Sequence, residues 1–167
     1  MSRGFVKEDD QEEAPFIPPR AALPTGAINY VTPRGYQLLL KEKANLETER
    51  SGLKAENETE RRRALAVIDG KLQLLKERLA SAREIDPTNQ IPDEVRFGAW
   101  VSIKNIDTNE QQEFQIVGVD EADVKKSKIA FVAPIAKAIT GKKVGETANF
   151  KLGVEVRMLK ILKISYK

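Results

Sequence analysis

The chain of 167 residues contains no cysteine and no histidine. It can therefore form no disulfide, carry out no thiol chemistry and offer no histidine as a general base or zinc ligand. Catalysis could rest only on carboxylates, lysine, serine, threonine or tyrosine. No Gly-rich phosphate loop, metal-ligand spacing or nucleophile elbow brings these residue types together. We therefore expect no catalytic residues, no metal and no cofactor of the protein's own.

Long apolar runs are also missing from the sequence. None approaches the length of a membrane span, and the acidic stretch over residues 7–13 is unlike a signal peptide. Aromatic residues make up only 6% of the chain, but hydrophobic residues reach 41% and can supply a core. The net charge of +3 is small and interspersed, so composition alone does not argue for nucleic-acid binding. We expect a cytoplasmic protein with no membrane partner.

The first 31 residues are rich in proline and in acidic side chains. The prolines are Pro15, Pro18, Pro19 and Pro24. Such a segment buries too little apolar surface to offset its ordering entropy, so we expect residues 1–31 to form a flexible N-terminal arm. Phe5, Phe16 and Ile17 could dock on a partner, but a disordered tail is the simpler interpretation.

Apolar residues between positions 32 and 86 recur with the 3.5-residue period of a coiled coil. The second half of this stretch carries Leu65, Ile68, Leu72, Leu75, Leu79 and Ala82. The first half carries Leu39, Leu46 and Leu53, spaced seven apart. The pairs Leu53–Leu65, Leu46–Leu72 and Leu39–Leu79 share residue 59 as their midpoint. A chain reversal between Glu56 and Arg61 would pair them all, which predicts an antiparallel coiled-coil hairpin over residues 32–86.

Capping residues give the expected helix boundaries. Thr32 followed by Pro33 is a typical helix start, so the first helix should cover residues 33–55, with Gly52 as a weak point. Asn57 with Glu60 three residues later resembles a capping pair for a second helix that continues to about residue 82. A proline-containing linker follows over residues 87–94.

From residue 95 onward the pattern changes to the two-residue period of strands. Strands are expected near residues 100–105, 114–118, 129–132, 148–152 and 154–165. A short helix is expected over residues 135–139, with Gly141 as its left-handed cap. The fold class is therefore α+β, with a C-terminal domain over residues 95–167 in which an antiparallel sheet wraps on a helix.

Two acidic clusters are candidate functional sites. The hairpin tip carries Glu56, Glu58 and Glu60 beside Asn57, and such carboxylates could coordinate a divalent cation. The simpler interpretation is that acidic residues are favoured in a helix's first turn by its dipole. The second cluster is Asp120, Glu121 and Asp123, between two predicted strands. It could meet a basic partner surface or be an ordinary acidic turn.

Several stretches resemble the bacterial Gre transcript-cleavage factors of RNA polymerase. They are YVTPRGY (residues 30–36), RFGAWV (96–101), QIVGVDEAD (115–123), APIA (133–136) and GKKVG (141–145). The resemblance covers about residues 30–167 and implies an N-terminal antiparallel coiled coil followed by an FKBP-like domain. In that family the globular domain docks at the rim of the polymerase secondary channel, and the coil enters the channel. Its tip acids help to hold the catalytic magnesium.

The resemblance implies a transcription elongation regulator that acts through the polymerase active site and is not itself an enzyme. It assigns Asp120, Glu121, Asp123 and Pro134 to the docking surface. Glu56 and Asn57 match the Glu-Asn of the family's Gly-Asp-Leu-x-Glu-Asn tip. The tip could thus share the polymerase-bound magnesium, and it could contact nascent RNA or DNA in the elongation complex.

Three departures from the family pattern qualify this expectation. The tip reads GLKAEN over residues 52–57, so the family's tip aspartate is missing. The first arm is about a dozen residues shorter, which removes roughly 18 Å of reach. Ala133 stands where a serine usually precedes the proline. We therefore expect polymerase binding with weak or absent stimulation of cleavage.

Other functions stay open on the sequence alone. The protein could be a non-cleaving competitor of Gre factors in the channel. An FKBP-like domain could instead belong to a peptidyl-prolyl isomerase or chaperone, although few aromatic residues are available for a proline pocket. A coiled-coil scaffold is a third possibility. The internal leucine pairs predict a monomer.

Overall fold

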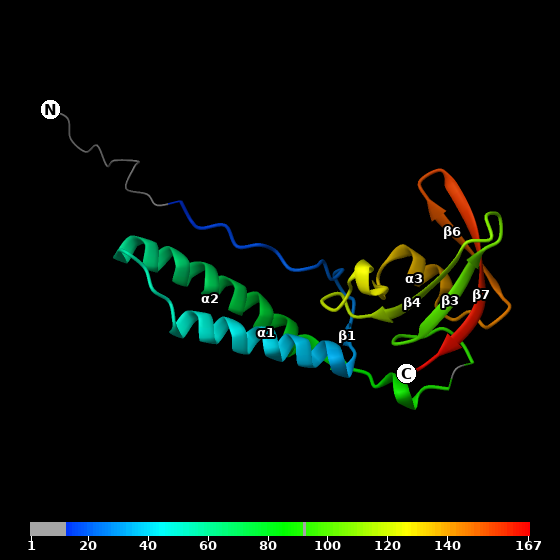
Figure 1. Cartoon of the computed structure of the whole chain (residues 1–167), viewed down its shortest axis with the longest axis horizontal. Helices are drawn as coiled ribbons and strands as arrows, with labels where there is room; N and C mark the ends of the chain where they lie inside the picture. Colours follow the sequence, from blue (N-terminus) through cyan, green and yellow to red (C-terminus); the bar gives the residue numbers. More distant parts are fainter. Residues whose placement is uncertain (1–12, 92) are drawn as a thin grey trace.

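Two long helices, α1 (Pro33–Ser51) and α2 (Glu58–Ser81), lie side by side and run in opposite directions at one end of the molecule (Figure 1). The other end is a five-stranded sheet with a short helix, so the protein is of mixed α and β class. The computed structural model describes residues 13–91 and 93–167. The prediction for Phe5, and for the arm as far as residue 12, lies outside this part.

Both predicted helix starts are present. The Thr32 hydroxyl accepts a hydrogen bond from the Gly35 amide at 2.9 Å, and Pro33 occupies the first helical position. The Asn57 side chain accepts a bond from the Glu60 amide at 2.8 Å at the start of α2. Both caps satisfy amides that have no partner inside their helix.

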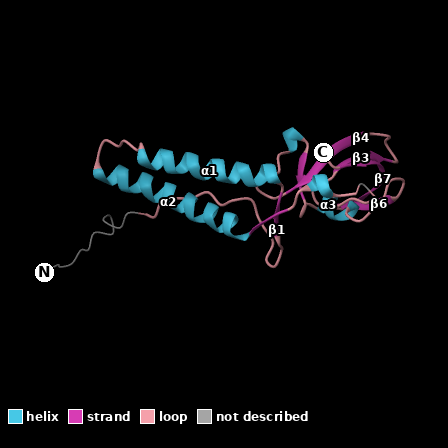
Figure 2. Cartoon of the chain, turned by 90° about the horizontal axis from the view of Figure 1, so that it is seen from below, coloured by secondary structure: helices cyan, strands magenta, loops and turns pink. Residues whose placement is uncertain are grey.

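The prediction that the first helix extends to residue 55 is wrong. Helix α1 ends at Ser51, whose hydroxyl donates to the Glu47 carbonyl at 3.0 Å. Gly52 then caps the helix with its amide bonded to the Thr48 carbonyl. Glycine disfavours a helix by about 1 kcal/mol relative to alanine, and serine is also a weak helix former. The chain therefore reverses over residues 52–57, which begins four residues before the predicted interval of 56–61 and overlaps it only at residues 56 and 57. Helix α2 projects beyond the end of α1 (Figures 1 and 2).

The two helices bury a leucine-rich seam between them. Its buried members are Val31, Leu39, Leu46, Ile68, Leu72 and Leu75, with Tyr36, Leu53, Leu79 and Ala82 at its edge. Across the helices, Arg50 Nε lies 2.7 Å from Asp69 Oδ1. Asp69 is one residue from Ile68, which the leucine register places opposite Arg50. This contact lies close to the pairing of Arg50 with Ile68 that the leucine register predicts.

Residues 29–31, assigned to the flexible arm from the sequence, form strand β1 (Asn29–Val31) instead. It pairs in parallel with β2 (Ala82–Glu84), directly after α2. Asn29 is buried and donates to the Arg78 carbonyl at 3.0 Å. The partner strand lies about fifty positions away in the sequence, so local composition gave no sign of the pairing. A single helical turn, η2 (Pro87–Asn89), leads on toward the sheet.

The main sheet has the strand order β5-β4-β3-β7-β6. Its strands are β3 (Trp100–Asn105), β4 (Gln111–Val117), β5 (Lys128–Ala130), β6 (Thr147–Leu152) and β7 (Glu155–Ser165). The predicted all-antiparallel sheet is wrong at one pair, because β4 and β5 run parallel. Residues 118–127, which include the turn η3 (Val124–Lys126), connect the two strands and carry the chain back so that β5 runs in the same direction as β4.

Alternate residues of the central strands form the core of the sheet domain. The fully or nearly fully buried side chains include Val101, Ile103, Phe114, Ile116, Leu159 and Ile161. Helix α3 (Pro134–Ile139) adds Ala136 and Ile139 to this core, and Gly141 follows it with a positive φ of 84°. None of the helices within residues 13–91 and 93–167 has the length and apolar character of a membrane span.

The seam predicts a specific loss of stability. Leu72 is 6% exposed, so Leu72→Ala should lower the free energy of unfolding by about 2–3 kcal/mol through lost burial and an unfilled cavity. Urea denaturation measures the change. The control is Leu38→Ala on α1, where the side chain is 44% exposed and a change of no more than about 0.5 kcal/mol is expected. Equal losses of stability in the two variants would contradict the burial of Leu72 in the seam.

Candidate functional site

The candidate tip residues Glu56, Asn57, Glu58 and Glu60 are all exposed at the end of the hairpin farthest from the sheet domain (Figure 1). Glu56 lies in the reversal loop, and Glu58 and Glu60 lie in the first turn of α2. Asn57 has a structural role beside the three acids, because its side-chain oxygen accepts the hydrogen bond from the Glu60 amide that caps the helix. Within residues 13–91 and 93–167, no three acidic groups converge in a way that could hold a metal ion.

The second acidic cluster lies at the junction between the hairpin and the sheet domain. Gly118 makes this junction possible, because a Cβ atom there would lie 2.5 Å from the Tyr30 carbonyl oxygen. Strand β1 can therefore pass directly over the end of β4. The residues that follow Gly118 are brought to the starts of α1 and β1. Asp120 and Glu121 consequently face the hairpin.

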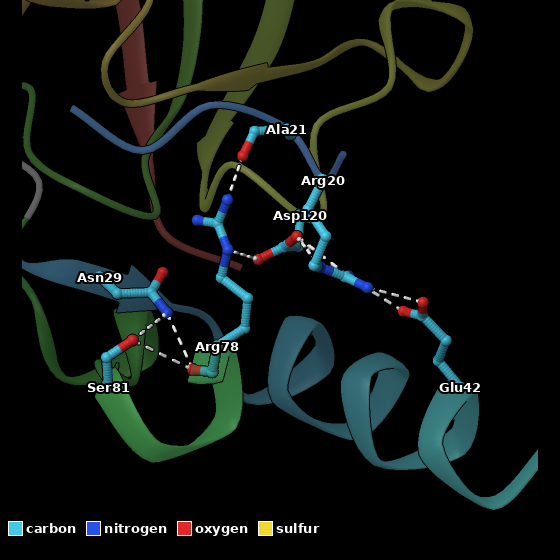
Figure 3. A network of polar contacts seen from close by, with 7 residues as sticks. All are labelled: Arg20, Ala21, Asn29, Glu42, Arg78, Ser81 and Asp120. Carbon is cyan, nitrogen blue, oxygen red and sulfur yellow. Dashed lines mark hydrogen bonds and ion pairs between the residues drawn. The ribbon is translucent and has the colours of Figure 1, made fainter. Parts of the chain in front are cut away.

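Asp120 is held in an ion-pair network (Figure 3). Its side chain is 7% exposed, and its Oδ1 accepts a hydrogen bond from Arg20 Nε at 3.0 Å. Arg78 Nε of α2 lies 3.8 Å from Oδ2. Arg20 also donates to both oxygens of Glu42 on α1, at 2.7 and 3.0 Å. Three segments of the chain thus meet at this carboxylate.

Glu121 is more deeply buried, with a side chain only 3% exposed. It accepts a hydrogen bond from the Thr32 hydroxyl, the same hydroxyl that caps α1. Lys128 Nζ lies 3.9 Å from Glu121 Oε2 and donates to Gln115 Oε1 at 2.6 Å. Burial lowers the pKa of Lys128, and the charge of Glu121 acts in the opposite direction. Lys128 also lies 5.2 Å from the ring centroid of Trp100, a cation–π contact.

The other two docking candidates are more accessible. Asp123 is half-buried and accepts a hydrogen bond from the Lys125 amide at 3.1 Å, which caps η3. Pro134 is exposed at the first position of α3. Of the four residues assigned to docking from the sequence, two have carboxylates that are used inside the molecule and two remain at the surface.

The sequence does not predict two features at the junction. Arg20 lies in the predicted flexible arm, where its position as a basic residue among prolines and acids is the only signal for it. Tyr30, Phe97 and Phe131 form a cluster with ring centroids 5.6–5.7 Å apart. They line a cavity of about 650 Å³. These three rings come from distant segments, so no local pattern could have grouped them.

Comparisons with known proteins agree with the resemblance. The family described as "Transcription elongation factor, GreA/GreB, C-term" matches residues 81–166. The transcription elongation factor GreA of Thermodesulfovibrio yellowstonii is 37% identical over 152 residues, which cover 82% of this chain and 96% of that protein. GreA of Hyphomonas neptunium is 41% identical over 100 residues, which cover 60% of this chain and 64% of that protein. The chain belongs to the GreA/GreB family of transcription elongation factors.

Solved structures of related proteins are also similar to this chain. One is GreA factor homolog 1 (Gfh1) of Thermus thermophilus, at 18% identity and a TM-score of 0.39, covering 83% of this chain and 99% of that one. Another is GreA/GreB from Nitrosomonas europaea, at 20% identity and a TM-score of 0.41, covering 84% of this chain and 99% of that one.

The buried pair at the junction predicts a change in titration. Because the charge of Glu121 raises the pKa of Lys128, Glu121→Gln should lower that pKa further below its ordinary value. The Lys128 side-chain ¹³Cε shift, followed by NMR against pH, measures the change. Glu113→Gln is the control, since Glu113 is exposed and accepts from Ser102. A Lys128 pKa that is the same in both variants would show that Glu121 and Lys128 are not coupled.

Proposed function

We propose that the protein binds RNA polymerase through its sheet domain at the rim of the secondary channel and inserts its helical hairpin into that channel. The observation that carries this proposal is the position of the exposed acidic tip, at the end of the hairpin farthest from the sheet domain (Figure 1). The chain that has this shape belongs to the GreA/GreB family. Family membership favours this function over a peptidyl-prolyl isomerase or a scaffold. The protein would act in the cytoplasm as an accessory factor, with no catalytic centre of its own.

We infer further that α1 and α2 form a coiled coil and that the sheet domain is FKBP-like. The buried seam residues Leu39 and Leu46 of α1 are seven apart, and Ile68, Leu72 and Leu75 of α2 follow steps of four and three. This seam is filled from within one chain. The protein should therefore act as a monomer.

The docking surface should divide into contact residues and supporting residues. Asp123 and Pro134 are accessible and would meet the polymerase directly. The carboxylates of Asp120 and Glu121 would have to leave their internal partners to do so, and leaving a buried cation unpaired is costly. They would instead hold the segment that presents Asp123.

The tip should reach the channel interior without completing a cleavage site. Helix α1 has 19 residues, so the paired part of the hairpin is only about 28 Å long at 1.5 Å per residue. The family's tip aspartate is absent, and Asn57 is occupied as a helix cap. Glu56, Glu58 and Glu60 remain free to approach the polymerase-bound magnesium, or RNA or DNA in the complex. Two groups can share a metal only if each is placed to well within about 1 Å, which the shortened tip does not achieve. We therefore propose that the protein mainly competes with longer factors for the channel.

The docking assignment predicts a salt-dependent loss of affinity. Asp123→Asn combined with Pro134→Ala should weaken binding to core RNA polymerase by about two- to fivefold, and more at low salt, where charge pairing is least screened. Asp107→Asn, an exposed acid in the turn after β3, is the matched control. Binding by the double variant as tight as by the control at every salt concentration would place the docking surface elsewhere.

The tip predicts a weak or absent effect on transcript cleavage. A stalled, backtracked polymerase with magnesium should release little cleaved RNA on addition of this protein, because the tip carboxylates are misplaced for metal sharing. The protein should also reduce the cleavage stimulated by a longer Gre factor in the same reaction.

The triple variant Glu56→Ala, Glu58→Ala, Glu60→Ala tests whether the tip only occupies the channel or also stimulates cleavage. Glu77→Ala, at an exposed position farther along α2, serves as the control. Robust cleavage with the parent and the control, lost in the triple variant, would refute the competitor role and make the tip a catalytic element.

A further inference from the structure

The segment that precedes β1 contacts both helices and the sheet domain. Arg20 joins Glu42 of α1 to Asp120 of the sheet domain, and the neighbouring Ala21 carbonyl accepts a hydrogen bond from Arg78 of α2 (Figure 3). The Arg20 side chain is only 17% exposed. A residue in a freely moving tail would be neither so buried nor so fully bonded.

A second anchor lies three residues earlier in the same segment. Ile17 packs on α2 at Gly70, in a space that a Cβ atom on residue 70 would fill. Glycine is a poor helix former, yet it occupies the middle of a 24-residue helix here. The packing of Ile17 accounts for this glycine. Two anchors on the hairpin and one on the sheet domain define the path of residues 13–28, which follows α2 (Figure 1).

Asp120 depends on Arg20 for its hydrogen bonding. Its Oδ1 receives the Arg20 bond, whereas its buried Oδ2 accepts no hydrogen bond from any residue that the structure describes. Arg78 approaches Oδ2 only to 3.8 Å. Arg20 binds Glu42 through two nitrogens at once, the fork geometry in which a guanidinium is most directional. One rigid planar group therefore connects two carboxylates on separate parts of the molecule.

We propose that residues 13–28 form a strap, and that Arg20 is a positioning residue that fixes the direction of the hairpin relative to the sheet domain. A rotation of 10° at the junction would move a tip about 28 Å away by about 5 Å. The consequence for channel entry rests on the proposed function, but the orientation itself does not. Inner contacts remain without the strap, among them the Tyr30 ring against Phe97 and the Thr32 bond to Glu121. Loss of Arg20 should therefore loosen the junction without unfolding either part.

The absence of native cysteine makes a distance measurement direct. Spin labels on Lys54→Cys, in the reversal loop, and Val154→Cys, in the exposed turn between β6 and β7, report the distance from tip to sheet domain. Pulsed electron paramagnetic resonance on the full chain, without polymerase, gives its distribution. Arg20→Ala should broaden that distribution at least twofold. Arg20→Lys should give an intermediate width, because a lysine keeps the charge but cannot bond both carboxylates in a fork.

The matched control is Arg50→Ala, which removes an exposed arginine–aspartate pair lying wholly within the hairpin. Its distribution should equal that of the parent. Gly70→Leu is a second route to the same effect, because it displaces Ile17, keeps Arg20 and replaces glycine with a better helix former. It should also broaden the distance distribution. If circular dichroism shows that Arg20→Ala is unfolded, Gly70→Leu becomes the test of whether the strap fixes the direction of the hairpin.

The outcomes separate the strap from the proposed function. Broadening in Arg20→Ala or Gly70→Leu, with normal helix content and an unchanged Arg50→Ala, supports the strap. Widths equal to the parent in every folded strap variant would overturn it. Since polymerase is absent from the measurement, failure of polymerase binding would leave this result intact, and failure of the strap would leave polymerase binding intact.

Discussion

Two nearly buried carboxylates, Asp120 and Glu121, connect the helical hairpin to the sheet domain. Each faces cations and hydrogen-bond donors from other segments: Arg20 and Arg78 for Asp120, Thr32 and Lys128 for Glu121. Removing charges from water is expensive, and such pairs persist only with good geometry and further hydrogen bonds. The close approach of β1 at Gly118 provides that geometry. The relative placement of the two parts therefore depends on these contacts.

This arrangement changes how the acidic loop after β4 is understood. The resemblance to Gre factors implies that its acids face the polymerase, and the docking proposed above keeps that role only for Asp123. Asp120 and Glu121 already have partners within the chain. A single short loop thus combines internal support with surface charge. A substitution at Asp120 would alter the junction and, through it, the segment that presents Asp123, so its effect on polymerase binding would be indirect.

The hairpin has a comparable division of roles. Its leucine seam holds α1 and α2 together, while at its far end α2 and the reversal loop extend beyond α1, which stops at Ser51 (Figures 1 and 2). The first turn of α2 then projects past its neighbour with Glu58 and Glu60 exposed. A tip supported by one helix is less constrained than one supported by two. Control of its position must come largely from the junction at the other end of the hairpin.

The sequence by itself determined the features that depend on near neighbours. Thr32 and Asn57 cap helices through contacts three residues away, and the leucine period and strand alternation follow from helical and pleated geometry. Only the tertiary structure decided the pairing of β1 with β2, the parallel entry of β5, and the partners of Arg20 and Asp120. These join segments up to 100 positions apart. Their free energy comes from burial and charge pairing that exist only after the chain has folded, and no local pattern of residue types records them.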